Sequence, residues 1–261
     1  MTIIQSVNRA LSIMDLFSYA RPSLSIAEIS QDLGLAKATV HNLVRTLEAQ
    51  GYLDQDRATR RYRLGTRLLA LGTIMAGTLE VNQMASGPLS RLADNTGLVG
   101  RVAVWDTDAA LVTLTVRPQY SESQAVRIGP RVEAYCSSIG RILLAYAGPG
   151  VAAEYLARVR PIAHTPKTVV DKAELAAELE ATRQRGYAAH SQQMSLGRAS
   201  IAAPIRGREG KVIAAVSLTG SPDRLTGPER ESLLGRLLPV ADEISRRLGH
   251  VPGATASRLG S

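Results

Sequence analysis

The side chains best suited to chemistry in this sequence lie on one predicted helix, which follows a turn at Gly34 and ends before Gly51. Apolar residues recur in this stretch at steps of three and four, which is typical of a helix with one buried face. The opposite face then carries groups that bind nucleic acids, because asparagine and arginine pair with base edges while lysine and threonine hold phosphates. A solvated polar face is the alternative for a helix taken alone. The candidate DNA contacts are Lys37, Ala38, Thr39, His41, Asn42 and Arg45.

A second cationic group crowds the tip of a predicted β-hairpin over residues 52–64. Two short runs with alternating apolar residues flank a polar stretch, as in a hairpin. Like charges at such a tip repel one another unless an anion lies between them. We expect Arg60 and Arg61 to hold DNA phosphates, and a solvated turn is the alternative. The arginines expected to neutralise neighbouring acids instead are Arg63 and Arg67.

A third polar group begins a predicted helix over residues 138–147. Ser137 and Ser138 precede an apolar run, so they lie where a helix presents free backbone amides and the positive end of its dipole. Gly140 leaves room for a close approach, and a carboxylate is a suitable ligand for such a helix start. The alternative is an ordinary serine cap that satisfies its own helix.

Catalysis would depend on the single cysteine. Cys136 with His164 or His190 could form a thiolate and imidazole pair, with acids available to orient the histidine. A lone cysteine is more often a small buried apolar residue. The sequence has no common motif for serine hydrolysis, zinc proteolysis or nucleotide binding, and no Cys and His cluster has zinc-site spacing. We therefore expect no enzyme activity, no cofactor and no metal.

The elements around the first two groups predict a winged helix-turn-helix domain. An amphipathic pattern predicts a helix over residues 6–20, and Ser25 with Glu28 forms a capping box for a second short helix. The third helix and the hairpin complete this domain. A linker helix over residues 66–80 follows. Its apolar positions outnumber what one face needs, so some of them are expected to pack against another protomer.

The remaining chain changes to short alternating runs between helical segments, which predicts an α/β (α+β) fold with a mixed α/β domain and an antiparallel sheet. The winged domain then covers residues 1–65, the α/β domain covers 81–250, and 251–261 form a loose tail. The strands are expected at 101–105, 110–116, 124–128, 200–205 and 212–219. The helices are expected at 80–95, 138–147, 151–159, 171–185 and 228–248.

The composition agrees with a folded protein that has a polyanionic partner. Hydrophobic residues make up 45% and charged residues 21% of the 261 residues, near the average of globular proteins. The 31 basic and 23 acidic residues leave a net charge of +8, which makes nucleic acid worth testing without locating it. With one cysteine, no signal peptide and no apolar stretch long enough for a membrane span, we expect a protein of the reducing cytoplasm.

Longer segments of both domains resemble one family, in the same order along the chain. The run LSIAEISQDLGLAKATVHNLVRTLEAQGYL, followed by RRYRLGTRLLALG, is similar to the N-terminal domain of the IclR-type bacterial transcription regulators. AYCSSIGRILLAY, HTPKTV, GRASIAAPI and AAVSLTG resemble landmarks of that family's effector-binding domain. AYCSSIGRILLA further resembles the branch that controls aromatic-acid and β-ketoadipate catabolism.

This resemblance implies a double-stranded DNA operator, a small organic acid as effector, and homodimers that commonly pair into tetramers. The sequence departs from the family pattern at Ala38, Asn42 and Leu98, where serine, arginine and glutamate are usual, so its operator and effector chemistry can differ. Besides Ser137 of the helix start, the residues that the resemblance assigns to the effector pocket are Ser138, Ile139, Gly140, Ser200, Ser217 and Thr219.

Three interpretations follow. The first is a DNA-binding transcription regulator whose operator binding is modulated by a small organic acid in the C-terminal domain. The second is a DNA-binding regulator whose C-terminal domain is only an oligomerisation scaffold, and a concave polar pocket or a thermal shift with a small acid would separate the two. The third is a thiol-dependent enzyme that uses Cys136, which turnover abolished by Cys136→Ala would support.

Overall fold

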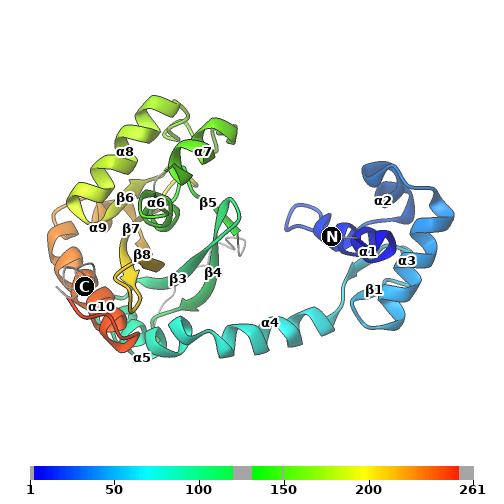
Figure 1. Cartoon of the computed structure of the whole chain (residues 1–261), viewed down its shortest axis with the longest axis horizontal. Coiled ribbons are helices and arrows are strands. Elements are labelled where there is room, and N and C mark those ends of the chain that lie inside the picture. Colours follow the sequence, from blue (N-terminus) through cyan, green and yellow to red (C-terminus); the bar gives the residue numbers. More distant parts are fainter. Residues whose placement is uncertain (1–2, 120–130, 149, 253–261) are drawn as a thin grey trace, which may run out of the picture. The chain divides into compact units, whose positions relative to one another are not determined.

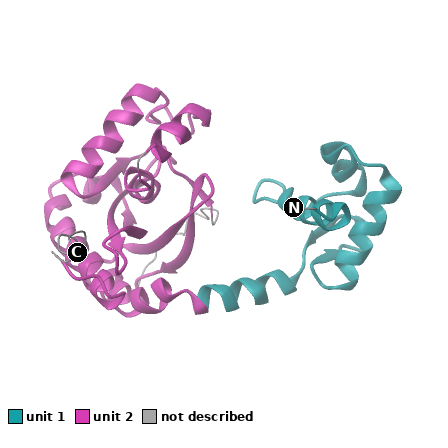
Figure 2. Ribbon diagram, in the orientation of Figure 1, with its two compact units in different colours: residues 1–77 teal, residues 78–261 magenta. Residues whose placement is uncertain are grey.

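The computed structural model describes most of the chain, namely residues 3–119, 131–148 and 150–252. The chain divides into two compact units, residues 1–77 and 78–261, which Figure 2 shows in different colours. This division falls inside the predicted linker helix. The expected strand at 124–128, and the expected tail from residue 253 onward, lie outside the described residues.

The first unit is a helix-turn-helix domain with a short antiparallel hairpin (Figure 1). Its core contains Ile13, Ile29, Val40, Val44 and Tyr62, which are almost inaccessible to solvent. Burial of each large aliphatic side chain contributes about 1.5 to 3 kcal/mol, so these few residues hold the helices together. The elements are α1 Gln5–Asp15, α2 Ile26–Leu33, α3 Lys37–Ala49, β1 Leu53–Gln55 and β2 Tyr62–Leu64.

The predicted first helix is too long at its C-terminal end, because α1 ends at Asp15. The backbone amides of Leu16 and Phe17 donate to carbonyls three residues back, which tightens the last turn and ends the helix. Leu16 and Phe17 still pack against the core of the first unit. Their apolar periodicity therefore continues the helical pattern although these residues form a turn.

Two local signals define the turn between α2 and α3. Ser25 Oγ accepts a hydrogen bond from the Glu28 amide, and the Glu28 carboxylate accepts one from the Ser25 amide at 2.7 Å, which completes the predicted capping box. Gly34 ends α2 with a φ of 63°, a left-handed conformation that favours glycine. The chain can then turn tightly, and α3 begins at Lys37.

Helix α4, Thr66–Thr78, continues from the hairpin, and α5, Glu80–Thr96, follows it. No residue of α4 is buried in the part of the chain that the structure describes. Leu69, Leu71 and Ile74 are exposed by 73%, 45% and 63%. This exposed apolar surface agrees with the excess of apolar positions in the sequence, and the protomer that would cover it stays a prediction.

The second unit is built on one antiparallel sheet. The described residues form six strands in the order β5-β4-β3-β8-β7-β6, and each neighbouring pair is antiparallel. The sequence pattern does not predict the edge strands β5 and β6, because three or four residues are too few to show an alternation. The strands are β3 Val99–Asp106, β4 Ala109–Val116, β5 Arg131–Glu133, β6 Ala188–Ser191, β7 Ala199–Arg206 and β8 Val212–Gly220.

Helices cover both faces of this sheet (Figure 1). Helices α5 and α10 pack on one face, against side chains such as Ile201 and Leu218. Helix α6 packs on the other face against small residues such as Ala202 and Ala215, with α7 and α8 outside it. The helices are α6 Ser138–Ala145, α7 Val151–Arg158, α8 Lys172–Arg185, α9 Pro222–Leu225 and α10 Arg230–Arg247. Among the described helices, none combines the length and apolar character needed to cross a membrane.

Candidate functional site

The predicted reading face of α3 is exposed in the structure. Val40 and Val44 are buried in the core, while His41, Asn42 and Arg45 point away from it. Arg45 forms an exposed ion pair with Glu48 at 3.2 Å, which leaves its guanidinium at the surface. The residues that the structure brings together on this side of α3 are Lys37, Ala38, Thr39, His41, Asn42 and Arg45.

The tip of the hairpin is held by an aspartate, and its arginines have different surroundings. The Asp56 carboxylate accepts hydrogen bonds from the amides of Ala58 and Thr59, which also holds the pKa of Asp56 below its usual value. Arg60 lies in the left-handed region with a φ of 59°, and its side chain is exposed. This conformation is uncommon outside glycine, so the tip is a defined turn that presents Arg60 to solvent.

Arg61 makes its contacts within the protein. Its guanidinium donates to Ser23 Oγ, to Ser23 O and to the Glu28 carboxylate at 3.1, 2.9 and 2.9 Å. Hydrogen bonds from Ser25, followed by those from Arg61, lower the pKa of Glu28 to about 2. Arg61 therefore joins the hairpin to the start of α2. Of the two arginines expected to neutralise acids, Arg63 pairs with Asp54 at 2.5 Å, whereas Arg67 lies over the Tyr52 ring.

The predicted effector hydroxyls come together on the sheet face that α6 covers. Ser138 Oγ, from the first turn of α6, lies 2.5 Å from Ser200 Oγ on β7. Ser200 pairs with Thr219 on the neighbouring strand β8. Ser217 lies on the same face as Thr219, because side chains two residues apart on a strand point the same way. Hydroxyls from three elements thus gather near the start of α6.

Three other predicted effector residues support this site from within the protein. Ser137 Oγ accepts a hydrogen bond from the Gly140 amide and donates to the Glu133 carbonyl. Ser137 is therefore an ordinary N-cap of α6. A Cβ at Gly140 would lie 2.5 Å from Ala134 Cα. Gly140 therefore makes room for the turn before α6. Ile139 is buried between α6 and the sheet.

Arg101 is a cation of this site that the sequence-based expectations missed. Its Nη1 donates to Thr219 Oγ1 at 2.9 Å. Burial, followed by the charges of Arg117 and Arg198, lowers the pKa of the Arg101 guanidinium. An anion beside Arg101 would offset the like charges that act on this guanidinium. The sequence signal was parity, because Arg101 lies two residues before Ala103, which faces α6, and side chains two residues apart on a strand point to the same face.

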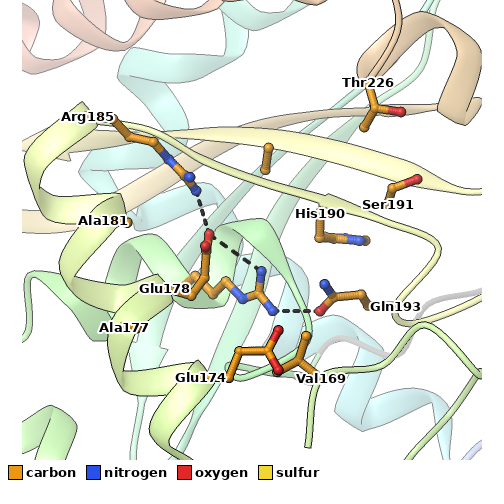
Figure 3. A pocket seen from close by; sticks show the side chains of 12 residues that line it. Val169, Glu174, Ala177, Glu178, Ala181, Arg185, His190, Ser191, Gln193 and Thr226 are labelled. Carbon is orange, nitrogen blue, oxygen red and sulfur yellow. Dashed lines mark hydrogen bonds and ion pairs between the residues drawn. The ribbon is translucent and has the colours of Figure 1, made fainter. Parts of the chain in front are cut away.

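Figure 3 shows a pocket of about 510 Å³ in the second unit. His190 lines this pocket and pairs with Ser200 across β6 and β7. Burial lowers the pKa of His190 to about 3, and its Nδ1 has no hydrogen-bond partner among the described residues. In the pocket wall, the buried Arg141 donates to Gln193 Oε1 at 2.6 Å and lies 3.7 Å from the Glu178 carboxylate. The predicted effector residues are absent from the described lining of this pocket.

The cysteine does not have the environment of a nucleophile. Ligand atoms of Cys136, His164 and Glu133 lie within 4.8 Å of one another, so the structure brings Cys136 to one of its two candidate histidines. Burial, followed by the charge of Glu133, raises the pKa of the Cys136 thiol to about 12. A thiol that stays protonated at neutral pH is a poor nucleophile, which argues against thiol catalysis.

A winged helix-turn-helix unit followed by an α/β unit is an architecture of DNA-binding transcription regulators. Residues 6–57 match the IclR helix-turn-helix domain, and residues 74–246 match the bacterial transcriptional regulator IclR C-terminal domain. The chain belongs to the IclR family of DNA-binding transcription regulators. Its relatives are regulators and not enzymes.

Similar proteins extend over nearly the whole chain. The HTH-type transcriptional regulator XynR of Escherichia coli (strain K12) is 33% identical over 250 residues, which cover 96% of this chain and 99% of that protein. The Pca regulon regulatory protein of Pseudomonas putida is 31% identical over 246 residues, covering 94% and 83%. The crystal structure of an IclR homolog complexed with 4-hydroxybenzoate from Microbacterium hydrocarbonoxydans is 27% identical, covers 94% and 99%, and has a TM-score of 0.77.

Proposed function

We propose that this regulator binds a small organic acid at the start of α6 and changes its operator binding in response. The contact between Ser138 Oγ and Ser200 Oγ carries this proposal, together with Arg101 held against Thr219 on the same sheet face. A carboxylate can accept hydrogen bonds from both serine hydroxyls, which otherwise bind each other. Its charge would also offset the repulsion among Arg101 and its neighbouring arginines.

Aromatic acids are the ligand class that we favour. The segment 134–145 resembles the branch of the family that controls aromatic-acid and β-ketoadipate catabolism. One structural relative holds 4-hydroxybenzoate, and one curated relative is named for the Pca regulon. In this chain, Trp105 and Met194 pack against the cluster that α6 forms with the sheet, so apolar surface is available near the hydroxyls.

On the DNA side, we propose that α3 enters the major groove. His41, Asn42 and Arg45 would contact base edges, and Arg60 at the hairpin tip would hold a phosphate. Arg61 would support the hairpin from within the protein. An operator as partner also implies action in the bacterial cytoplasm. The remaining α3 contacts, through phosphates or apolar groups, are Lys37, Ala38 and Thr39.

We further propose a homodimer, with dimers paired into tetramers, in which a second protomer covers α4. Leu69→Ser and Ile74→Ser should shift the sedimentation coefficient toward the monomer, because they remove exposed apolar surface. Ile213→Ser, at an exposed apolar position of β8, is the matched control. A wild-type monomer that binds an operator of two half-sites with full affinity would contradict the dimer.

Titration calorimetry on the full chain tests the acid site, with 4-hydroxybenzoate and a panel of aliphatic and aromatic acids as probes. Ser138→Ala and Ser200→Ala should each weaken binding by about 1.5 to 3 kcal/mol, as for hydrogen bonds to a charged group. Operator binding without the acid should stay nearly unchanged. Ser191→Ala, in the neighbouring pocket, is the control.

The outcomes of this titration separate the alternatives. Unchanged affinity in both serine variants would place the acid elsewhere, and a loss confined to Ser191→Ala would move it to the pocket of Figure 3. If no acid of the panel binds or shifts the melting temperature, the scaffold interpretation of the second unit is favoured over a ligand site.

A further inference from the structure

Three side chains that bind zinc in other proteins meet in front of α6. Glu133 ends β5, and Cys136 follows it in the turn that leads to Ser137. His164 comes from the segment between α7 and α8. One ligand atom from each of these residues lies within 4.8 Å of the other two. Carboxylate oxygen, thiolate sulfur and imidazole nitrogen are all common zinc ligands.

The side chains of this cluster meet at one carboxylate oxygen, Glu133 Oε2. Glu133 Oε2 lies within hydrogen-bond reach of His164 Nε2, 3.1 Å from the Tyr135 hydroxyl and 3.6 Å from Cys136 Sγ. With usual zinc distances, a sulfur and an oxygen in a tetrahedral site are about 3.6 Å apart. The sulfur and oxygen therefore already have the separation of two ligands of one ion. A small opening of the contact between Glu133 and His164 would admit the metal.

The protein holds the segment that carries His164 in place. Thr165 Oγ1 and Thr168 Oγ1 donate to the backbone carbonyls of Gln192 and Gln193, each at 2.6 Å. The Tyr135 ring also stacks on His164. A ligand on an anchored segment loses little conformational entropy when it binds a metal, so affinity is favoured.

A cation can reach the cluster from solvent. The side chains of His164 and Glu133 are 35% and 44% exposed. Glu133 also lines a surface pocket of about 450 Å³. Cys136 Sγ lies behind them as the buried donor. A cation entering from solvent would therefore meet Glu133 and His164 first and Cys136 behind them.

We propose that Glu133, Cys136 and His164 form a zinc site with three protein ligands and an open fourth position. Binding of Zn²⁺ breaks the S–H bond of Cys136 and releases that proton to solvent, while His164 binds through an unprotonated nitrogen. The glutamate and thiolate charges balance the charge of the ion. Thiolate and imidazole ligands select zinc over magnesium or calcium. This site is independent of the proposed acid site at Ser138 and Ser200.

The sequence-based expectation of no metal depended on Cys and His spacing alone. Glu133 was not counted, and His164 lies in a different segment of the fold. Only the return of the chain from α7 to the turn before α6 brings the three ligands together.

The test uses the untagged full chain after treatment with a chelator. We expect the chain to compete with a chromophoric chelator for Zn²⁺ and to bind one ion per chain. Co²⁺ should give a thiolate-to-cobalt charge-transfer band, which only Cys136 can supply because it is the single cysteine of the sequence. Cys136→Ser should remove this band, and Cys136→Ser and His164→Gln should each weaken zinc binding at least about tenfold. His41→Ala, which removes an exposed histidine from α3, is the control and should bind zinc as the wild type does.

Three results would overturn the zinc site. The first is that the wild type retains no zinc in competition with the chelator. The second is that the wild type binds cobalt without the charge-transfer band. The third is that Cys136→Ser and His164→Gln both bind zinc with the affinity of the wild type. Circular dichroism of the two variants and their operator binding, compared with the wild type, show that they are folded. The failure of the zinc site would leave the acid titration of Ser138 and Ser200 unaffected.

Discussion

The two proposed binding surfaces of this regulator differ in how far their polar groups are exposed to solvent. On α3, Asn42 and Arg45 are exposed, and the pair of Arg45 with Glu48 is at the surface, where an incoming duplex can reach both side chains. At the start of α6, Ser138 and Ser200 are buried and bind each other, with Arg101 held against Thr219. A nucleic-acid surface uses side chains that reach outward, whereas a small acid is bound by groups already removed from water. The two surfaces should therefore respond differently to substitution.

A large effect is expected on operator recognition by α3. Arg45→Ala and Asn42→Ala should each weaken specific operator binding by about 1 to 3 kcal/mol, because each removes a contact with a base edge. Arg91→Ala is the matched control, since Arg91 is also an exposed arginine in an ion pair, with Glu243. Fluorescence anisotropy with operator and scrambled duplexes measures the difference. If both α3 variants bind the operator as the wild type does, α3 does not read the bases.

At the buried surface near the start of α6, the charge of Arg101 is expected to contribute to acid binding. Arg101→Met should weaken binding of an acid that the wild type binds by about 1.5 to 3 kcal/mol, the range for hydrogen bonds to charged groups. Without acid, this variant should melt no lower than the wild type, because it relieves repulsion from Arg117 and Arg198. Arg208→Met, at a side chain that is 80% exposed, is the control. Full acid affinity in Arg101→Met would remove this guanidinium from the site.

The same contrast explains what the sequence could predict. The face of α3 and the capping box at Ser25 are local, so a helical period and residue spacing are enough to identify them. The hydroxyl cluster depends on strand register, which places Ser200 beside Thr219 and under Ser138. Resemblance to a family supplied those residues, and periodicity could not have done so.

Residues with two plausible roles were the hardest to predict. Arg60 and Arg61 are neighbours in the sequence, but Arg61 turns back to Ser23 and Glu28 while Arg60 is exposed. Gly140 likewise makes room for Ala134, a contact that no local pattern reveals. The roles of such residues follow from tertiary contacts, so composition and spacing leave them open.

Arg60 and Arg61 sharpen the comparison within the first unit. Arg60→Ala should reduce the slope of log affinity against log salt by up to about one unit, because one phosphate contact is lost. Arg61→Ala should instead destabilise the first unit by less than about 1 kcal/mol, since its pair with Glu28 is partly exposed to solvent. Salt titrations and thermal melts measure the two effects. Equal changes of salt slope in both variants would show that Arg61 also reaches the DNA.

The smallest effect at neutral pH is expected at His190, and it grows in acid. Burial, followed by the charge of Arg141, lowers the pKa of His190 from 6.5 to about 3, so the unfolded chain binds a proton there before the folded chain does. Folding stability should therefore be fully present above pH 6.5 and fall as the pH drops from 6.5 toward 3. The acids and bases near His190 in the pocket are Arg141, Glu174, Glu178 and Arg185, which also contribute to the total pH dependence. His190→Gln removes only the histidine contribution, so the difference between wild type and variant in urea melts should be constant above pH 6.5 and shift in favour of the variant below it. A difference that stays constant down to pH 5 would mean that His190 takes up its proton in the folded protein as readily as in the unfolded chain. Water would then reach the His190 imidazole, and the contrast between a buried surface in the second unit and an exposed one on α3 would not hold at this residue.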